Sequence, residues 1–218
     1  MKTIKIFLLS MLSVFSTLSM AQTIRPLSVE QPNAVFIKVG LNQALLAVTL
    51  GYQHRLSNQS QLVLGSDASA VPNFLSNSRV YAGLQYKLYQ KGPFVLPLRL
   101  MGSTAFAKNE LYRAVNFSTE LSSHPQIQIA RWTFGVDAAY RRGLVTHLTH
   151  SDRYRSLAYA DAVDGWYKNS SSTLRAGASL SYLIRSFEIG AQAGYQVNGK
   201  YDIFLPPYYG VLTTSFRF

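Results

Sequence analysis

Residues 130–140 read ARWTFGVDAAY and carry the pattern that decides the fold. Apolar or aromatic side chains occupy every second position, namely Ala130, Trp132, Phe134, Val136, Ala138 and Tyr140. The positions between them hold Arg131, Thr133, Gly135, Asp137 and Ala139. This alternation predicts a β-strand with two chemically different faces. Its length exceeds the roughly five or six residues of an ordinary soluble strand and suits a tilted strand that crosses a bilayer, which needs about 9–11 residues.

The same alternation recurs along most of the chain. The clearest further segments are 46–55, 79–88, 94–101, 174–184, 187–197 and 208–218, and shorter ones cover 35–41, 62–68 and 111–121. Pro97 has no amide N–H to donate, so we expect a bulge or a local break there. These segments predict a closed, antiparallel, all-β transmembrane barrel of ten strands. Eight strands is the alternative, if 35–41 and 111–121 are not strands.

The connections between these segments are of two lengths. Tight turns are expected at 57–60, 90–92, 122–125 and 185–186, and longer loops at 66–77, 143–171 and 198–207. Short turns at one end and long loops at the other are typical of outer-membrane barrels. An even strand count also places both ends of the chain at the short-turn end. No internal repeat or linker divides the chain.

Periodicity alone leaves a soluble barrel or sandwich open, with the apolar face inside. Two features favour the inverse arrangement. The polar face is rich in Gly, Ser, Thr, Gln and Ala rather than in Lys and Glu, which suits a narrow interior. Aromatic residues gather near strand ends, as interfacial girdles require. Only 14% of residues are charged while 48% are hydrophobic, and the mean hydropathy is +0.05, which excludes a disordered chain.

The first 21 residues have the features of a secretory signal peptide. Lys2 and Lys5 precede an apolar stretch at 6–15, and Ser19-Met20-Ala21 ends in small residues suited to cleavage. The apolar stretch is too short to span a bilayer. We therefore expect residues 1–21 to direct export through the inner membrane and residues 22–218 to form one barrel domain. The chain has no Cys, which excludes disulfides and thiolate sites.

The last segment adds a more specific pattern. Tyr208, Leu212, Phe216 and Phe218 lie on one face of the strand, and Phe218 is the final residue. This arrangement resembles the C-terminal signature of bacterial outer-membrane β-barrels, which the barrel assembly machinery recognises. Together with the aromatic-rich strands and the junction after Ala21, the chain resembles the small barrels of the Bacteroidota type. The resemblance implies a location in the cell outer membrane and says little about activity.

Charged residues also fall on the polar face, where a barrel would enclose them. The expected interior charges are Lys38, Arg55, Lys87, Arg99, Arg131, Arg141 and Arg175, with Asp67, Glu120, Asp137 and Glu188 as acids. Because a buried charge needs a partner, these residues are expected to form ion pairs that fill the interior. The excess of cations leaves a narrow anion-preferring pore as an alternative.

One cluster has catalytic residue types, at His147, His150 and Asp152. Barrel enzymes that act on lipid A use Ser and His, and barrel proteases use Asp and His. The spacing of three places the two His on opposite faces of a strand, so these residues are weak catalytic candidates. Two His and a carboxylate could hold a transition metal only if they converged. We expect a surface loop, with no metal and no cofactor.

The formal net charge of +11 could indicate a nucleic-acid binder. The barrel interpretation accounts for it differently, through a paired interior and through cations such as Lys91, Lys108, Arg142 and Arg185 near lipid or lipopolysaccharide phosphates. The sequence therefore favours an integral outer-membrane barrel with a structural or envelope-contact role that is not enzymatic. Its expected partners are outer-membrane lipid, lipopolysaccharide and the barrel assembly machinery, without nucleic acid. An enzyme acting on lipid A or peptides, a narrow pore and a soluble ligand-binding barrel are the alternatives.

Overall fold

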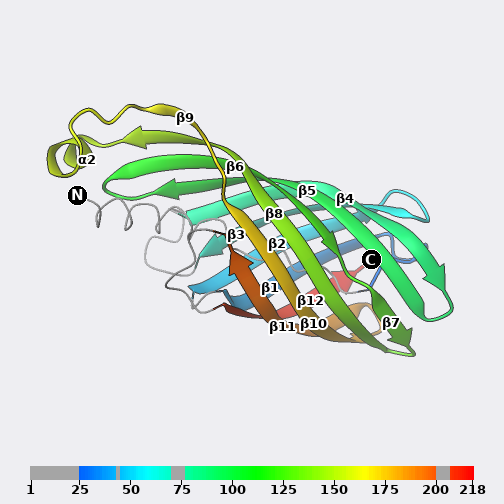
Figure 1. Ribbon diagram of the computed structural model, residues 1–218. Helices are drawn as coiled ribbons and strands as arrows, with labels where there is room; N and C mark the ends of the chain where they lie inside the picture. Colours follow the sequence, from blue (N-terminus) through cyan, green and yellow to red (C-terminus); the bar gives the residue numbers. More distant parts are fainter. Residues whose placement is uncertain (1–24, 43–44, 70–76, 200–206) are drawn as a thin grey trace.

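The computed structural model describes residues 25–42, 45–69, 77–199 and 207–218. The expected signal peptide, residues 1–21, lies outside the described residues. So do residues 70–76 and 200–206, which make up most of the loops expected at 66–77 and 198–207. Figure 1 shows a barrel of long, tilted strands. The described helix is too short to cross a membrane.

Ten antiparallel strands form the wall of the barrel. They are β1 (Asn33–Asn42), β2 (Leu45–Arg55), β3 (Ser60–Ser69), β4 (Asn77–Lys91), β5 (Phe94–Lys108), β6 (Tyr112–Ser123) continued by β7 (Gln126–Ile129), β8 (Trp132–His150), β10 (Ser172–Ile184), β11 (Phe187–Asn198) and β12 (Tyr208–Arg217). Each strand pairs with its neighbours in sequence, and β1 pairs with β12. The expected count of ten is therefore confirmed.

The pairing register shows how the barrel closes. Starting from Lys38 and following paired residues through β2 to β6 leads to Thr146 on β8. Following the pairs in the other direction, through β12, β11 and β10, leads to Thr133 on the same strand. The two paths meet the same strand at different heights, as they must when tilted strands close a barrel.

The two ends of the barrel differ. The turn end carries the tight turns between β2 and β3, β4 and β5, β7 and β8, and β10 and β11, together with the start of β1 and the end of β12. The loop end carries the remaining connections. The longest of them contains α2 (Asp152–Leu157) and β9 (Gly165–Lys168), and β9 pairs with β8. Residues 144–168 thus form an outer hairpin that extends past the barrel (Figure 1).

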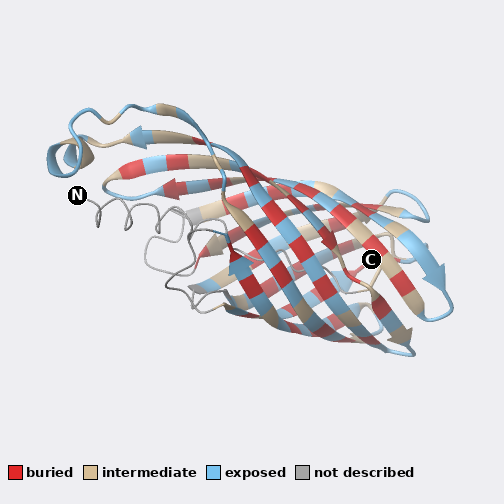
Figure 2. Ribbon diagram, in the orientation of Figure 1, coloured by how far each residue is buried: buried red, intermediate tan, exposed pale blue. Residues whose placement is uncertain are grey.

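The strand faces are inverted relative to a soluble barrel. Figure 2 shows buried and exposed residues alternating along the strands at the front of the view, such as β8 and β10. The exposed positions are apolar: on β8, Phe134 and Val136 are 49% and 58% exposed, whereas Thr133 and Asp137 on either side of them are buried. The soluble-barrel alternative requires the opposite arrangement, with apolar side chains inside. The apolar face at 130–140 points outward.

Three local features differ from the sequence-based expectation. Residues 122–125 are not a turn, because the wall strand continues through β7 and turns at Ala130 and Arg131. Pro97 stays within β5, and the bulge falls on the neighbouring strand between Lys87 and Tyr89. The loop expected at 143–171 is partly strand, since β8 continues to His150 past a second bulge opposite Phe117 and Ser118.

Glycines on the inner face make room for large side chains. Phe36 is paired with Gly51, and a Cβ on Gly51 would stand 2.0 Å from the Phe36 ring. Tyr81 covers Gly65 on the neighbouring strand in the same way. Phe36 and Tyr81 can therefore lie flat against the wall and pack with Val63 and Met101 into a buried apolar cluster. This cluster fills part of the interior between β1 and β5.

Candidate functional site

The interior of the barrel is lined by charged side chains. The buried ones are Lys38, Asp67, Arg79, Arg99, Glu120, Asp137, Arg141, Arg175, Glu188 and Arg217. They come from nine strands, because alternation turns every second residue of each strand inward. Among the described residues this set holds six cations and four acids.

Each of the four acids accepts a hydrogen bond or forms an ion pair with an arginine. Arg79 Nε donates to Asp67 Oδ2 at 2.8 Å, and Thr49 Oγ1 donates to the other oxygen of that carboxylate at 2.7 Å. Glu120 lies between Arg141, at 2.8 Å, and Arg99, at 3.7 Å. These contacts compensate for the desolvation of the charges.

The other two acids bind partners nearer to β12. Arg175 Nε lies 3.1 Å from Asp137 Oδ2, and the Tyr209 hydroxyl donates to Asp137 Oδ1 at 2.8 Å. Glu188 is paired with Arg217 and accepts a hydrogen bond from Ser181 Oγ at 2.7 Å. Both ion pairs join neighbouring strands of the wall, β8 with β10 and β11 with β12. The Tyr209 hydrogen bond instead connects β12 with β8, two strands that do not pair with each other.

Lys38 differs from the buried arginines described above because it forms no ion pair with a described residue. Its side chain is fully buried, and its ammonium makes no hydrogen bond with a described residue. The ammonium instead lies 4.3 Å from the centroid of the Phe36 ring, a cation–π contact.

The structure separates the expected interior charges into two groups. Lys38, Arg99, Arg141 and Arg175, with Asp67, Glu120, Asp137 and Glu188, are buried inside. Arg55, Lys87 and Arg131 lie at the turn end instead, where Arg55 donates to Ser57 O and Lys87 to Gln90 Oε1. These three stand within a few residues of a turn, and their long side chains extend to the rim.

Sequence reasoning missed three buried basic residues, namely Arg79, Arg217 and His124. Arg79 and Arg217 each stand two positions from an inward-facing residue, Tyr81 and Ser215, so the period of two was enough to find them. His124 was not identifiable in this way because it falls at the interruption between β6 and β7, which resembles a turn in sequence. Its Nε2 lies 2.9 Å from Ser179 Oγ in the interior.

The N-terminal segment, residues 25–32, contacts the turn end of the barrel. The Arg25 backbone N–H donates to Glu188 Oε1 at 3.1 Å, and Arg217 donates to the carbonyl oxygen of Arg25 at 3.0 Å. Arg55 donates to Leu27 O, and the Leu27 side chain is only 5% exposed. This segment therefore binds to interior charges at the mouth rather than hanging free, and burial lowers the pKa of the Arg25 guanidinium.

The candidate catalytic residues do not converge in the outer hairpin. His147 packs edge-on against Trp166, with ring centroids 4.9 Å apart. His150 Nδ1 lies 2.9 Å from Oδ1 of Asp164, a residue that was not among the catalytic candidates. Asp152 instead lies 3.6 Å from Arg155. Within the described residues, no group of three or more His, Asp or Glu side chains is placed to hold a metal ion.

Asp164 is the centre of a small polar cluster. It accepts hydrogen bonds from the His150 backbone N–H at 2.8 Å and from Arg155 at 2.9 Å, in addition to its contact with the His150 ring. These bonds lower the pKa of the Asp164 carboxyl to about 2, with the two His150 contacts contributing most. The cluster ties α2 and the segment before β9 to the end of β8, and Ser151 hydrogen-bonds Glu110 O instead of the His150 ring.

Comparisons with known proteins give structural neighbours of low sequence identity. The sequence matches no family model and no curated protein. The fold is similar to the beta domain of the Bordetella autotransporter Brka, at 10% identity and a TM-score of 0.38, over 85% of this chain and 98% of that one. It is also similar to a deltaS2 mutant of the TodX monoaromatic hydrocarbon channel, at 10% identity and a TM-score of 0.37, over 80% of this chain and 70% of that one.

Proposed function

We propose that the chain is an integral outer-membrane β-barrel with a non-enzymatic role in the envelope, and that its outer hairpin is the surface it presents for contact. The observation that carries this proposal is the inverted burial of the wall. Outward apolar side chains such as Val136 and Ile189 are 58% and 54% exposed, while Arg79 and Glu120 are buried. A closed wall with an apolar exterior suits hydrocarbon, where an open sheet edge would leave backbone groups unsatisfied.

The outer hairpin has the properties of a contact surface. Its exposed apolar side chains include Leu157, Val163 and Trp166, which are 67%, 70% and 63% exposed. The Asp164 cluster keeps the hairpin ordered, so a partner would meet a formed surface rather than a free chain. Exposed aromatic residues such as Trp166 are common centres of binding energy at protein interfaces.

Two features of the sequence support the outer membrane as the location. The segment at 1–21 has the composition of an export signal, and the strand at 208–218 resembles the signature read by the barrel assembly machinery. In the barrel, Tyr208, Leu212, Phe216 and Phe218 are exposed on the outer face, where an assembly factor can contact them before lipid does. Lipopolysaccharide would face cations of the loop end, such as Lys108 and Arg142. We also propose that the chain is a small barrel of the Bacteroidota type.

The proposal is tested by membrane association and by the sidedness of the hairpin. The protein should fractionate with the outer membrane and migrate faster on a gel before heating than after. Trypsin added to intact cells should cleave at Arg153 in the hairpin, and Arg153→Gln should remove that cleavage. Recovery in the soluble periplasmic fraction would refute the membrane barrel. Protection of Arg153 in intact cells but not in lysed cells would refute the external position of the hairpin.

An anion-preferring pore is a second candidate, favoured by the excess of buried cations and by the Lys38 ammonium, which makes no hydrogen bond with a described residue. The apolar cluster of Phe36, Val63, Tyr81 and Met101 and the N-terminal segment both oppose it, because they occupy the interior and its mouth. Single-channel recording in a planar bilayer separates the two candidates. The filled-interior proposal predicts no conductance steps, whereas regular anion-selective steps that disappear in Lys38→Met would support the pore.

A barrel enzyme is a third candidate, favoured by the pairing of His150 with Asp164. A carboxylate that accepts the Nδ1 proton leaves Nε2 of an imidazole to act as a base. The two catalytic readouts are the lipid A profile of overexpressing cells and cleavage of added peptides. An altered profile or peptide cleavage that is lost in His150→Ala would support the enzyme. Unchanged lipid A and uncut peptides with the wild-type protein would exclude these two activities.

A further inference from the structure

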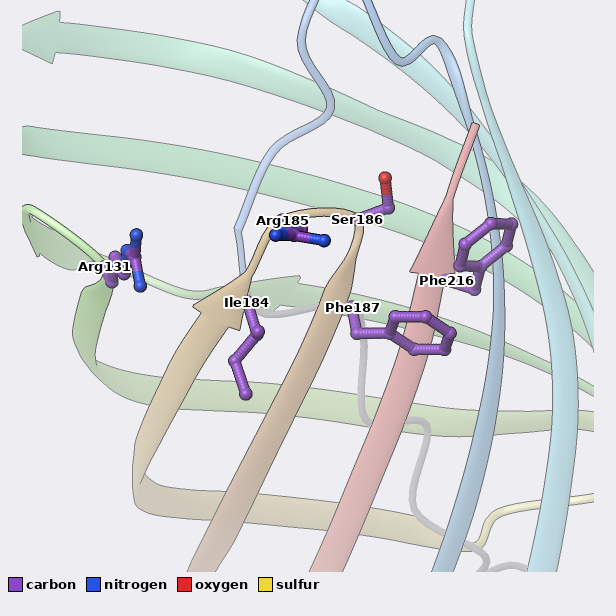
Figure 3. A pocket seen from close by; sticks show the side chains of 6 residues that line it. All are labelled: Arg131, Ile184, Arg185, Ser186, Phe187 and Phe216. Atoms are coloured by element: carbon purple, nitrogen blue, oxygen red, sulfur yellow. The ribbon is translucent and has the colours of Figure 1, made fainter.

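A cavity of about 650 Å³ opens on the outer face of the barrel at the turn end. It is lined by Arg131, Ile184, Arg185, Ser186, Phe187 and Phe216. Figure 3 shows the two arginines at the level of the turns, with the Ile184 side chain projecting alongside the strand beneath Arg185. Hydrogen bonding of Leu183 N to Arg131 O, at 2.9 Å, places the two turns next to each other.

The two halves of this cavity differ in chemistry. Ile184, Phe187 and Phe216 are 44%, 51% and 38% exposed and face outward, and the rings of Phe187 and Phe216 lie 4.9 Å apart. Arg131 and Arg185 are exposed at the rim, and neither forms an ion pair with a carboxylate of the described residues. An apolar wall beneath two uncompensated guanidinium groups is complementary to an anionic lipid.

The backbone at these turns also favours a role for the arginines. Arg185 has a φ of 55°, in the left-handed region that Gly or Asn normally occupies. The neighbouring turn places Ala130 at a φ of 51° immediately before Arg131. Gly or Asn would relieve the strain at 185, so an arginine there is unfavourable for the turn alone. Strain of this kind indicates a site where the side chain serves another purpose.

We infer that this cavity binds one anionic phospholipid, with its phosphate between Arg131 and Arg185 and an acyl chain against Ile184, Phe187 and Phe216. The inference rests on the proposed membrane location, because the turn end then lies at the level of the periplasmic-leaflet headgroups. Guanidinium groups recognise phosphate oxygens through paired, charge-assisted hydrogen bonds. Ser186 belongs to the turn itself, since its hydroxyl accepts a hydrogen bond from Gln31 Nε2 at 2.8 Å.

The test is native mass spectrometry of the full chain released from detergent micelles that contain equal amounts of phosphatidylglycerol and phosphatidylcholine. The wild-type protein should retain one phosphatidylglycerol preferentially. Arg131→Ala with Arg185→Ala should reduce that retention at least tenfold, and the corresponding double lysine variant should keep most of it. Lys91→Ala is the matched control, because it removes an exposed cation at another turn of the same end without touching the cavity.

Two results would overturn the inference. One is equal retention of the two lipids by the wild-type protein. The other is a preference for phosphatidylglycerol that falls as much in Lys91→Ala as in the double alanine variant, which would indicate a diffuse charge effect. A large excess of inorganic phosphate should leave the lipid bound, because phosphate lacks the acyl chain; displacement of the lipid by phosphate would also refute the site. A change in gel mobility on heating shows that each variant is folded. Absence of that change in the wild type would refute the proposed barrel instead.

Discussion

The buried pair of Asp67 and Arg79 distinguishes a filled interior from a water-filled one. Both side chains are about 1% exposed, and the carboxylate also accepts the Thr49 hydroxyl. Asp67→Leu leaves the Arg79 guanidinium without its carboxylate in a dry interior. Loss of one partner from a buried pair costs about 3–5 kcal/mol, whereas an ion pair in water contributes only about 0–1 kcal/mol. We therefore expect Asp67→Leu to lower the free energy of unfolding by about 3–5 kcal/mol.

The assay is denaturant unfolding in liposomes, followed by the fluorescence of Trp132 and Trp166 and by heat-dependent gel mobility. The matched control is the double variant Asp67→Leu with Arg79→Met, which removes both charges. Replacing both members of a buried pair with apolar groups is close to neutral, so the double variant should recover most of the lost stability. A single-variant cost of about 1 kcal/mol or less would refute the reasoning, since it would mean that water reaches the pair.

Two further predictions concern the glycine at the wall and the hairpin. Gly51→Val should lower the free energy of unfolding by about 1–3 kcal/mol, because the valine side chain would displace the Phe36 ring. Gly210→Ala is the control, because no atom lies within 4 Å of the added carbon. Equal effects of the two substitutions would contradict the packing of Phe36 against Gly51. Asp164→Asn should increase cleavage of the outer hairpin by added protease near neutral pH. In the wild type the Asp164 pKa is lowered from 3.8 to about 2, so the carboxylate's stabilisation should be complete above pH 3.8 and lost as the pH falls towards 2. Pepsin cleavage of the hairpin, measured relative to an unfolded substrate at each pH, that rises already between pH 6 and pH 5 would argue against Asp164 as the titrating group.

The wall of the barrel was largely accessible from sequence. A period of two separates the two faces of each strand without any tertiary information. The composition of the polar face and the aromatic residues near strand ends then predicted the orientation seen on β8. The count of ten depended on 35–41 and on 111–121, and the alternation of apolar and polar residues is least regular in 111–121. The segment at 111–121 forms a strand because β5 and β8 pair with it on either side.

The errors fall where the chain pattern is locally ambiguous. Ser122 to Pro125 has turn composition, yet the interruption at His124 and Pro125 occurs inside a wall strand whose two parts both pair with β5 and β8. Long-range pairing thus overrides local propensity.

The candidate site was predictable only in part. Alternation identifies which charges point inward, but not which acid meets which arginine, because that depends on the stagger of the strands. The cavity beside Arg131 and Arg185 depends on two turns that lie more than fifty positions apart in the sequence and meet only when β8 pairs with β10. The pairing of His150 with Asp164 likewise requires the fold of the outer hairpin.

The central claim is that apolar side chains face lipid and polar ones fill a dry interior. The chain has no Cys, so spin labels can be attached at single introduced cysteines without background. Variants at Val136 and Ile189 probe the outer face, and variants at Thr133 and Thr213 probe the interior. Collisions with oxygen and with a water-soluble nickel complex are then measured in liposomes. The account predicts high oxygen and low nickel accessibility outside, and low accessibility to both inside. High nickel accessibility at Val136 and Ile189 would contradict the membrane barrel. High nickel accessibility at Thr133 and Thr213 would contradict the filled interior.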